Sequence, residues 1–315
     1  MNIFLPFVYI LVMFLVIGTV FRATYLRSKK DAVKPYGQLV DLDDGTMHVY
    51  SMGDGEKKIV LLAGLGIPLP SADFSPLMRT LSKSHTVICV EYFGMGFSSQ
   101  TSKPRTCENY VKEIREALAQ AGFSAPYILM PHSISSVYSE YYAAQYPDEI
   151  DGIVCLDGTS TAFYKETPKI LNIILPIVSV IQVLGIMPFV AFLTTNKKKL
   201  LSNGYSEKEI NDAIVFSGFS MNKTVIEQMA QSSEHVKQVM DLPFPESVPY
   251  LKIISKETWE TPVKELKMTP EEYQHQHLAR IGDHAKYEIL EGNHFLHVNN
   301  AETIAELTDQ FLTPS

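Results

Sequence analysis

The sequence contains only three cysteines, and their positions exclude two common roles. Cys89, Cys107 and Cys155 are widely separated, so they form none of the closely spaced pairs that bind zinc. Three is also too few for the disulfide framework of a small secreted domain. Cys89 and Cys155 lie in apolar runs, where a cysteine is normally a small buried hydrophobic residue. The sequence therefore predicts neither a metal site nor an oxidising compartment.

Positive charge is also scarce. The chain has 27 lysines and arginines against 35 aspartates and glutamates, which gives a formal net charge of -8. No basic stripe occurs in the body of the sequence, so we expect no nucleic-acid partner. The 315 residues are enough for one large domain or two small ones. A hydrophobic content of 46% and a charged content of 20% are typical of a globular protein with an added apolar segment.

That apolar segment lies near the start of the sequence. Ile3–Phe21 carries no charge and is close to the ~20 residues that a helix needs to cross a bilayer. A secretory signal peptide would have positive charge before the apolar run and a small-residue cleavage site after it, and the sequence shows neither. Basic residues follow the run instead: Arg22, Arg27, Lys29, Lys30 and Lys34. We therefore predict an uncleaved single-pass anchor with a basic linker over residues 1–35, and a cytoplasmic location for the rest of the chain.

Beyond residue 36, short apolar strands alternate with amphipathic helices. This alternation is typical of an α/β fold with a mostly parallel sheet and helices on both faces. We expect strands over residues 38–42, 46–52, 58–63, 86–91, 127–130, 150–156, 250–255 and 286–290, the first two as a hairpin. We expect helices over residues 74–81, 108–121, 269–281 and 301–312, and another that begins at Ile134.

Residues 158–248 do not continue this alternation of strands and helices. Ile170–Phe192 is long and uncharged, so hydropathy alone would allow a second membrane span. A single crossing there would place Ser133 and every residue beyond 200 on opposite sides of the membrane, so we reject it. We interpret 158–248 as an apolar helical lid, with two polar helices over 205–240, inserted between core segments 36–157 and 249–315. Its surface is suited to covering a hydrophobic substrate or contacting a bilayer.

One serine lies at a junction between a strand and a helix. The strand Tyr127–Met130 ends just before Pro131-His-Ser133-Ile-Ser135, and helical spacing follows. A hydroxyl at such a turn projects from the end of the sheet beside a helix N-terminus, which favours negative charge. The usual nucleophile elbow is G-x-S-x-G, and here Pro131 and Ser135 replace the two glycines. The alternative is an ordinary strand–turn–helix in which the serine is a helix N-cap.

Four motifs in order resemble the α/β-hydrolase superfamily over residues 38–314. Ala63-Gly-Leu65-Gly is similar to the oxyanion loop, with alanine replacing the usual histidine. The stretch from Glu91 to Ser98 is similar to D-x-x-G-x-G-x-S, and we interpret Glu91 as structural. The elbow at Ser133 and Gly292-Asn-His294-Phe complete the series. The resemblance implies a hydrolase with a helical cap insertion and no cofactor or metal.

The resemblance also implies catalytic roles. Ser133 would be the nucleophile and His294 the general base, with the backbone N–H groups of Leu65 and Ile134 as the oxyanion hole. Of the nine histidines, we expect His294 to fill the role and His297 to lie near the site. The others that we considered are expected elsewhere: His132 pointing away around the turn, His48 on the first hairpin, and His275 and His277 on a solvated helix surface, too poorly aligned for a metal pair.

The acid that orients the base has two candidates. Most relatives carry it after the strand that we expect at 250–255, where Glu257 is near and Thr258 occupies the aligned position. Some lipases and haloalkane dehalogenases carry it after the preceding strand, where this sequence has Asp157 followed by glycine. We favour Asp157, with Glu257 as the alternative acid. An aspartate that merely caps the first turn of the lid is the ordinary structural interpretation.

The sequence thus predicts a membrane-anchored serine hydrolase of carboxylic esters, including lipid-like ones. A serine nucleophile argues against the dehalogenase and epoxide hydrolase branches, which attack with aspartate. An amidase or peptidase-like hydrolase of the same mechanism is one alternative. A catalytically silent binding or signalling protein on the same fold is another, because this fold hosts many functions.

Overall fold

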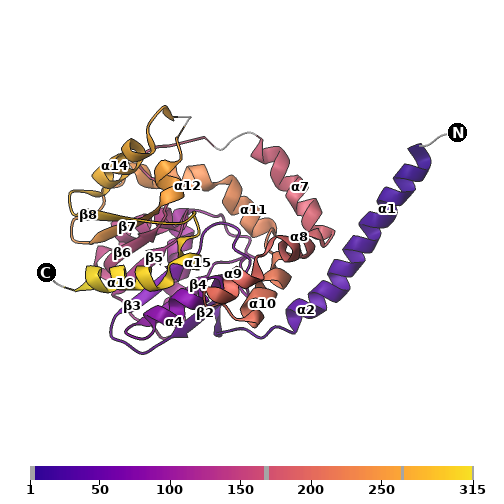
Figure 1. The fold of residues 1–315 in the computed structure, drawn as a ribbon, viewed down its shortest axis with the longest axis horizontal. Helices are drawn as coiled ribbons and strands as arrows, with labels where there is room; N and C mark the ends of the chain where they lie inside the picture. The colour runs from indigo at the N-terminus through magenta and orange to yellow at the C-terminus, as the bar shows by residue number, and fades with distance from the viewer. Residues whose placement is uncertain (1–3, 167–169, 264–265, 314–315) are drawn as a thin grey trace.

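A computed structural model describes residues 4–166, 170–263 and 266–313. Its centre is an eight-stranded sheet with the strand order β1-β2-β4-β3-β5-β6-β7-β8 (Figure 1). β2 is antiparallel to its neighbours β1 and β4, and the other pairings are parallel. The strands are β1 Gln38–Leu42, β2 Gly45–Met52, β3 Lys58–Leu62, β4 Thr86–Glu91, β5 Tyr127–Pro131, β6 Ile150–Leu156, β7 Tyr250–Ser255 and β8 Ala285–Leu290. The predicted α/β fold with a mostly parallel sheet is confirmed.

Helices cover both faces of the sheet, as expected. α5 (Cys107–Gln120) and α6 (Ser135–Gln145) pack on one side, where Val60 and Leu62 of β3 are buried. α4 (Ser75–Leu81) and α16 (Ala301–Leu312) pack on the other, where Ile59 and Leu61 of the same strand are buried. Successive side chains of a strand point to opposite faces, so a strand buried on both faces is continuously apolar. Shorter helices are α3 Pro70–Asp73, η2 Pro147–Glu149, α13 Lys256–Glu260 and α15 Leu296–Asn299, and α14 spans Pro270–Ile281.

The segment between β6 and β7 is helical. It contains α7 Leu171–Val183, α8 Ile186–Thr194, α9 Lys197–Ser202, α10 Glu207–Ser217, α11 Lys223–Ala230 and α12 Ser232–Met240. We refer to α7–α12 as the cap. The prediction of two helices over 205–240 is wrong, because the structure has three helices there. α10 ends at Ser217, and Asn222 caps the next helix, α11, by accepting a hydrogen bond from the Val225 N–H group.

The N-terminal segment forms a long helical arm that projects from the body (Figure 1). It consists of α1 Phe4–Phe21, a π-helical turn η1 Arg22–Leu26, and α2 Arg27–Asp31. α1 touches the cap closely, since a side-chain carbon at Gly18 would lie 2.6 Å from the carbonyl oxygen of Leu184. The first residue of the expected anchor, Ile3, lies outside the described residues.

A single membrane-spanning helix is not supported by the structure. Among the described residues, no one helix is both long and apolar enough to cross a bilayer. Two cap segments, Ile173–Val183 and Ile186–Thr194, are long and apolar enough only when they are taken together. The chain bends by 93° between these two segments.

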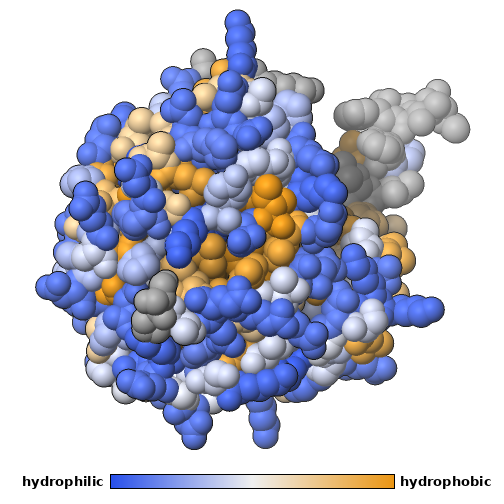
Figure 2. All heavy atoms as spheres, turned by 60° about the vertical axis from the view of Figure 1, so that its left-hand side comes forward, coloured by the Kyte–Doolittle hydropathy of each residue, from blue (hydrophilic) through white to orange (hydrophobic). Residues whose placement is uncertain are grey.

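Exposed hydrophobic side chains are concentrated on the arm and on the first two cap helices. Examples are Tyr9, Ile17, Ile173, Ile177 and Phe189, each exposed by more than half. By contrast, the face nearer β8 and α16 is mostly hydrophilic, with hydrophobic atoms visible toward its middle (Figure 2). The molecule therefore has one strongly apolar side.

Candidate active site

Ser133 lies in the sharp turn that joins β5 to α6. Its φ of 58° is in the left-handed region, which is unusual for a residue other than glycine. The turn is held from below, because the Ser133 N–H donates to the carbonyl oxygen of Leu156 at 3.1 Å. Strained backbone at a single serine between a strand and a helix is the geometry of a nucleophile elbow. Ser133 itself is not the side-chain cap of α6, whose N-cap residue is Ile134.

His294 lies in the loop after β8 and reaches Ser133 across the end of the sheet. Its Nε2 is 2.9 Å from Ser133 Oγ, and its Nδ1 is 2.7 Å from Asp157 Oδ2. An ionised carboxylate only accepts, so Nδ1 carries a proton and donates it to Asp157. In the neutral ring Nε2 is then unprotonated and accepts from the serine hydroxyl. The structure thus brings together Ser133, His294 and Asp157 in one chain of hydrogen bonds.

Asp157 follows the last residue of β6, also with a left-handed φ, of 46°. Its carboxylate accepts from the Ser255 N–H at 2.9 Å, from the Ser255 hydroxyl at 3.0 Å and from the Thr258 hydroxyl at 2.7 Å. Burial opposes ionisation of this group, but the hydrogen bonds from His294, Ser255 and Thr258 outweigh it and lower the pKa of Asp157. Asp157 is therefore ionised at neutral pH.

The alternative acid does not occupy this position. The side chain of Glu257 is exposed to solvent, and its backbone N–H donates to the carbonyl oxygen of Gly292 at 3.2 Å. Glu257 supports the His294 loop through its backbone, whereas the carboxylate on the imidazole is that of Asp157.

Two backbone N–H groups next to Ser133 are available as donors. Those of Leu65 and Ile134 donate no hydrogen bond within the part of the chain that the structure describes. Gly64 allows its loop to pass close to the elbow, since a side-chain carbon there would lie 2.9 Å from His132 Nδ1. Ser135 fixes the loop from the other side, because its hydroxyl donates to the Ala63 carbonyl oxygen at 2.5 Å. The serine that replaces the second elbow glycine therefore has a contact of its own.

His132 does not point away around the turn, and that prediction is wrong. Its ring centroid lies 4.7 Å from that of His294, and its Nε2–H donates to the His294 carbonyl oxygen at 2.9 Å. Burial, followed by the neighbouring His297 and His294, lowers the pKa of His132 to about 3. Its neutral ring packs under the His294 loop because the elbow turns the side chain back toward β8. His297 lies near the site as expected, because its ring centroid is 4.9 Å from that of His132.

The remaining motif residues are structural. Glu91 is fully buried and accepts from the N–H groups of Ser71 at 3.0 Å and Phe97 at 2.7 Å. His48 lies on β2 of the first hairpin and its Nδ1 is 3.1 Å from Glu91. The structural interpretation of Glu91 is confirmed.

The prediction of a solvated surface holds for His275 and fails for His277. His277 is fully buried, with Nε2 3.0 Å from Glu140 and Nδ1 2.6 Å from the ammonium of Lys252. The helix turns this face toward the core, where Glu140 and Lys252 satisfy both ring nitrogens. No group of three or more potential metal ligands occurs among the described residues.

A cavity of about 230 Å³ opens beside Ser133. Leu65 and Ile134 form one wall, and Ser232 and Val236 of α12 form part of another. Phe163, just before the cap, adds an aromatic ring. The cap therefore contributes directly to the space in which a group attached to Ser133 would lie.

Sequence reasoning missed the residues that support the acid. Ser255 and Thr258 both donate hydrogen bonds to Asp157, although Ser255 is the last residue of a different strand, β7, and Thr258 follows that strand. The sequence did offer one sign of the role of Thr258, because this residue occupies the position at which most relatives of the resembled superfamily carry the acid. In this chain the carboxylate follows β6 and a hydroxyl, that of Thr258, follows β7. Because β6 and β7 are adjacent and parallel, the two side chains still meet at the same edge of the sheet.

Comparison with known proteins gives the same fold. Residues 59–176 match the family described as alpha/beta hydrolase fold. An uncharacterised protein, YbdG, of Bacillus subtilis strain 168 is 28% identical over 307 residues, which cover 95% of this chain and 93% of that protein. These matches agree with the motif order that the sequence showed.

Solved structures agree as well. The Cif epoxide hydrolase from Acinetobacter nosocomialis is 16% identical with a TM-score of 0.68, covering 94% of this chain and 96% of its own. The enol-lactonase from Burkholderia xenovorans LB400 is 18% identical, with a TM-score of 0.62. The match covers 88% of this chain and 100% of the lactonase chain. The likeness at this level of identity is one of fold, and it agrees with the fold class that the motif order predicts.

Proposed function

We propose that this chain, which has the fold of the α/β-hydrolase superfamily, is a serine hydrolase that cleaves carboxylic esters. Ser133 acts as nucleophile, His294 as general base and Asp157 as the acid that orients His294. The proposal rests on one observation, the chain of hydrogen bonds from Asp157 through His294 to Ser133 at 2.7 and 2.9 Å. Serine, base and orienting acid within hydrogen-bond reach form the arrangement that activates a hydroxyl for acyl transfer.

In the first half-reaction, Ser133 Oγ attacks the carbonyl carbon of the ester while His294 Nε2 takes the hydroxyl proton. The imidazolium that forms is stabilised by the ionised Asp157 at Nδ1. Negative charge develops on the former carbonyl oxygen, and the N–H groups of Leu65 and Ile134 donate to it. When the intermediate collapses, the bond to the alcohol breaks and His294 returns the proton to the leaving alkoxide.

The second half-reaction repeats these steps with water. His294 Nε2 takes a proton from the water that attacks the acyl-enzyme, and the new oxyanion is held by the same two N–H groups. Collapse releases the carboxylic acid, and Ser133 Oγ regains its proton from His294.

An apolar acyl group suits the space beside Ser133. Apolar side chains, among them Leu65, Phe163 and Val236, border the cavity together with hydroxyl groups such as that of Ser232. The cap helices α7 and α8 expose large aliphatic side chains. The enol-lactonase neighbour is a protein whose name describes the opening of a cyclic ester. These observations favour an ester with a hydrophobic acyl part, including lipid-like ones, over a peptide.

Membrane attachment through the N-terminal arm is part of the same proposal. α1 is apolar, and from Tyr9 to Phe21 most of its side chains are exposed rather than packed on the body. The basic residues that follow, beginning with Arg22, favour a cytoplasmic location for the hydrolase part. In cells, the protein is expected to remain in the membrane pellet after washing at alkaline pH. Quantitative release by the wash would exclude an anchored protein.

The catalytic proposal is tested by covalent labelling. A fluorophosphonate probe should label the full chain, and mass mapping should place the adduct on Ser133, because only an activated serine reacts readily. Labelled protein should lose its activity toward p-nitrophenyl esters of increasing acyl length.

Ser133→Ala is the matched control, and Ser135→Ala tests the neighbouring hydroxyl. Ser133→Ala should abolish the adduct, whereas Ser135→Ala should keep it. A folded protein that does not react, or whose adduct survives Ser133→Ala, would remove Ser133 from the nucleophile role. Faster cleavage of a matched anilide than of the ester would make the enzyme an amidase.

A further inference from the structure

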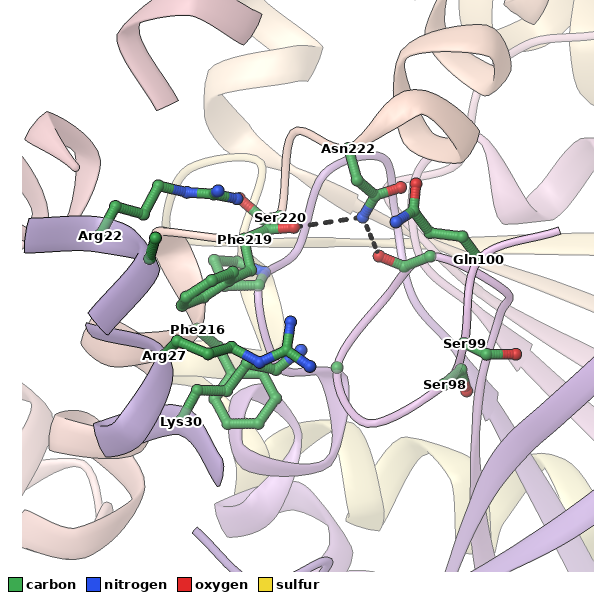
Figure 3. Close-up of a pocket in the computed structure, with 14 residues that line it drawn as sticks. Arg22, Arg27, Lys30, Ser98, Ser99, Gln100, Phe216, Phe219, Ser220 and Asn222 are labelled. Atoms are coloured by element: carbon green, nitrogen blue, oxygen red, sulfur yellow. Dashed lines mark hydrogen bonds between the residues drawn. The ribbon is translucent and has the colours of Figure 1, made fainter. Parts of the chain in front are cut away.

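A second cavity, of about 470 Å³, lies between the N-terminal arm and the cap, and shares no lining residue with the cavity beside Ser133. Arg22, Arg27 and Lys30 border it on the side of the arm, as Figure 3 shows. The opposite wall is the loop after β4, which includes Ser98, and the start of α11. None of the residues that line this cavity, all within the described part of the chain, carries a carboxylate.

The π-helical turn η1 gathers the three cations on one side of the arm. In a regular α-helix, residues five apart point about 140° away from each other. Here the Arg27 N–H bonds to the Arg22 carbonyl oxygen, so residues five apart lie one above the other. Lys30 then follows Arg27 by three residues in α2, which keeps it on the same face. Single π-turns of this kind are frequent at functional sites.

Aromatic rings of the cap hold two of these cations in place. The Arg22 guanidinium lies 4.6 Å from the ring centroid of Phe219, and its Nε donates to the Gly218 carbonyl oxygen at 3.0 Å. The Lys30 ammonium lies 5.1 Å from the ring of Phe216 and 5.2 Å from that of Phe219. These contacts order the side chains without neutralising them.

The positive charge is only partly balanced. Asp31 accepts from Arg27 Nε with both oxygens at 3.1 Å, although both side chains are more than half exposed, and the charges of Asp31 and Glu91 also act on Lys30. Burial, followed by the charge of Arg27, lowers the pKa of both Arg22 and Lys30. Three cations that repel one another around a hollow are stabilised by an anion placed between them.

We propose that the cavity formed by Arg22, Arg27 and Lys30 with Phe216 and Phe219 is a binding site for a phosphate-bearing group, with a lipid headgroup as the favoured source. Two guanidinium forks and an ammonium match the several oxygens of a phosphate, which each accept charge-assisted hydrogen bonds. The site lies where the apolar helix α1 ends, since Arg22 follows Phe21 directly. Headgroup phosphates of a bilayer lie at the corresponding level when such a helix is inserted.

This inference does not rest on the proposed hydrolase activity, and its test separates the two. The Ser133→Ala full chain, in micelles of a nonionic detergent, is titrated by calorimetry with 1,2-dihexanoyl phosphatidate and, separately, with inorganic phosphate. We expect saturable binding of the phosphatidate. Changing Arg27→Gln together with Lys30→Gln should weaken it by about tenfold or more, since each variant removes a charge-assisted contact.

The matched control is Lys29→Gln with Lys34→Gln, which removes the same charge from exposed positions of the same segment outside the cavity. It should change the dissociation constant by no more than about twofold. Arg27→Gln alone is the second variant, because Arg27 is exposed and its loss leaves the Phe216 and Phe219 contacts intact. It should weaken binding while the unfolding temperature stays unchanged.

The two probes distinguish the sources of the phosphate group. Tighter binding of the phosphatidate than of inorganic phosphate supports a lipid headgroup, and equal binding supports the site with a free phosphate as its ligand. No binding of either probe overturns the proposal. So does a loss of affinity that is equal in the Arg27→Gln/Lys30→Gln chain and in the control.

Discussion

At the scale of single residues, the carboxylate beside His294 is that of Asp157, which directly follows β6. A hydroxyl from the segment after β7, that of Thr258, donates a hydrogen bond to this carboxylate. Asp157 accepts four hydrogen bonds, from Ser255 twice, from Thr258 and from His294. β6 and β7 are adjacent parallel strands, so their carboxyl ends lie side by side. Either strand can therefore supply the acid without moving the histidine.

Asp157→Asn is predicted to lower kcat by about a thousandfold or more, because an amide cannot stabilise the imidazolium or hold its Nδ1–H in the same tautomer. Glu257→Gln should stay within about threefold of the unchanged enzyme, since its side chain is exposed. Steady-state hydrolysis of a p-nitrophenyl ester measures both, and circular dichroism checks that each variant is folded. The reverse pattern would transfer the role of the acid to Glu257.

At the scale of elements, α12 connects the cap to the helix that follows Ser133. His235 Nδ1 accepts from the hydroxyl of Tyr138 on α6 at 3.0 Å, and its Nε2–H donates to the carbonyl oxygen of Arg105. Tyr138 in turn stacks on Tyr110 of α5, with ring centroids 4.2 Å apart. Because Val236 borders the cavity beside Ser133, this buried contact fixes part of the wall of that cavity.

His235→Ala is predicted to raise KM several-fold while kcat changes by about twofold or less, because α12 shapes the cavity without touching the reacting groups. The buried hydrogen bonds and packing that are lost should cost about 2–3 kcal/mol of unfolding free energy. Ester kinetics and urea unfolding measure the two effects. Lys237→Ala, on the exposed side of α12, is the control. A fall in kcat at constant KM would contradict this role for α12.

At the scale of the whole molecule, buried polar groups connect elements that are distant in sequence. Glu140 of α6 contacts both His277, at 3.0 Å, and Arg280, at 3.0 Å, on α14. Burial, followed by the charge of Lys252, lowers the pKa of His277 to about 4. Under the loop that carries His294, burial likewise lowers the pKa of His132 and keeps its ring neutral. With His235, whose pKa burial also lowers, these buried neutral histidines make global stability depend on pH.

The free energy of unfolding is predicted to fall as the pH is lowered below about 6.5, the usual pKa of an unfolded histidine. Below that value the unfolded chain binds protons that folded His132 and His277 do not bind until pH about 3 and about 4. Each histidine can cost up to about 1.4 kcal/mol per pH unit in this window. Urea midpoints at pH 7.5, 6 and 5 measure the slope, and His277→Gln should make it shallower. A midpoint that does not change over this range would mean that neither ring is held neutral.

Much of the core could be predicted because local patterns and burial agree there. The strands over 150–156 and 250–255 and the helix over 301–312 have the predicted bounds, since continuous apolar runs and amphipathic spacing are local signals. The cap was harder, because three helices occupy residues 205–240 where two were predicted, and only Gln231 separates α11 from α12. His277 was misplaced because its partners, Glu140 and Lys252, lie far away in the sequence.

The order of strands, helices and motifs along the chain was enough to predict the α/β-hydrolase fold and to single out Ser133 and His294. The tertiary structure was needed to show which carboxylate faces His294, because Asp157 and Glu257 both lie just beyond the ends of neighbouring strands and only the side chain of Asp157 contacts the imidazole. It also decided where His132 lies and which cations of the N-terminal arm share one face. Each of these depends on contacts between distant segments or on a backbone turn, the left-handed φ at Ser133 or the π-turn at Arg22, that residue types do not specify.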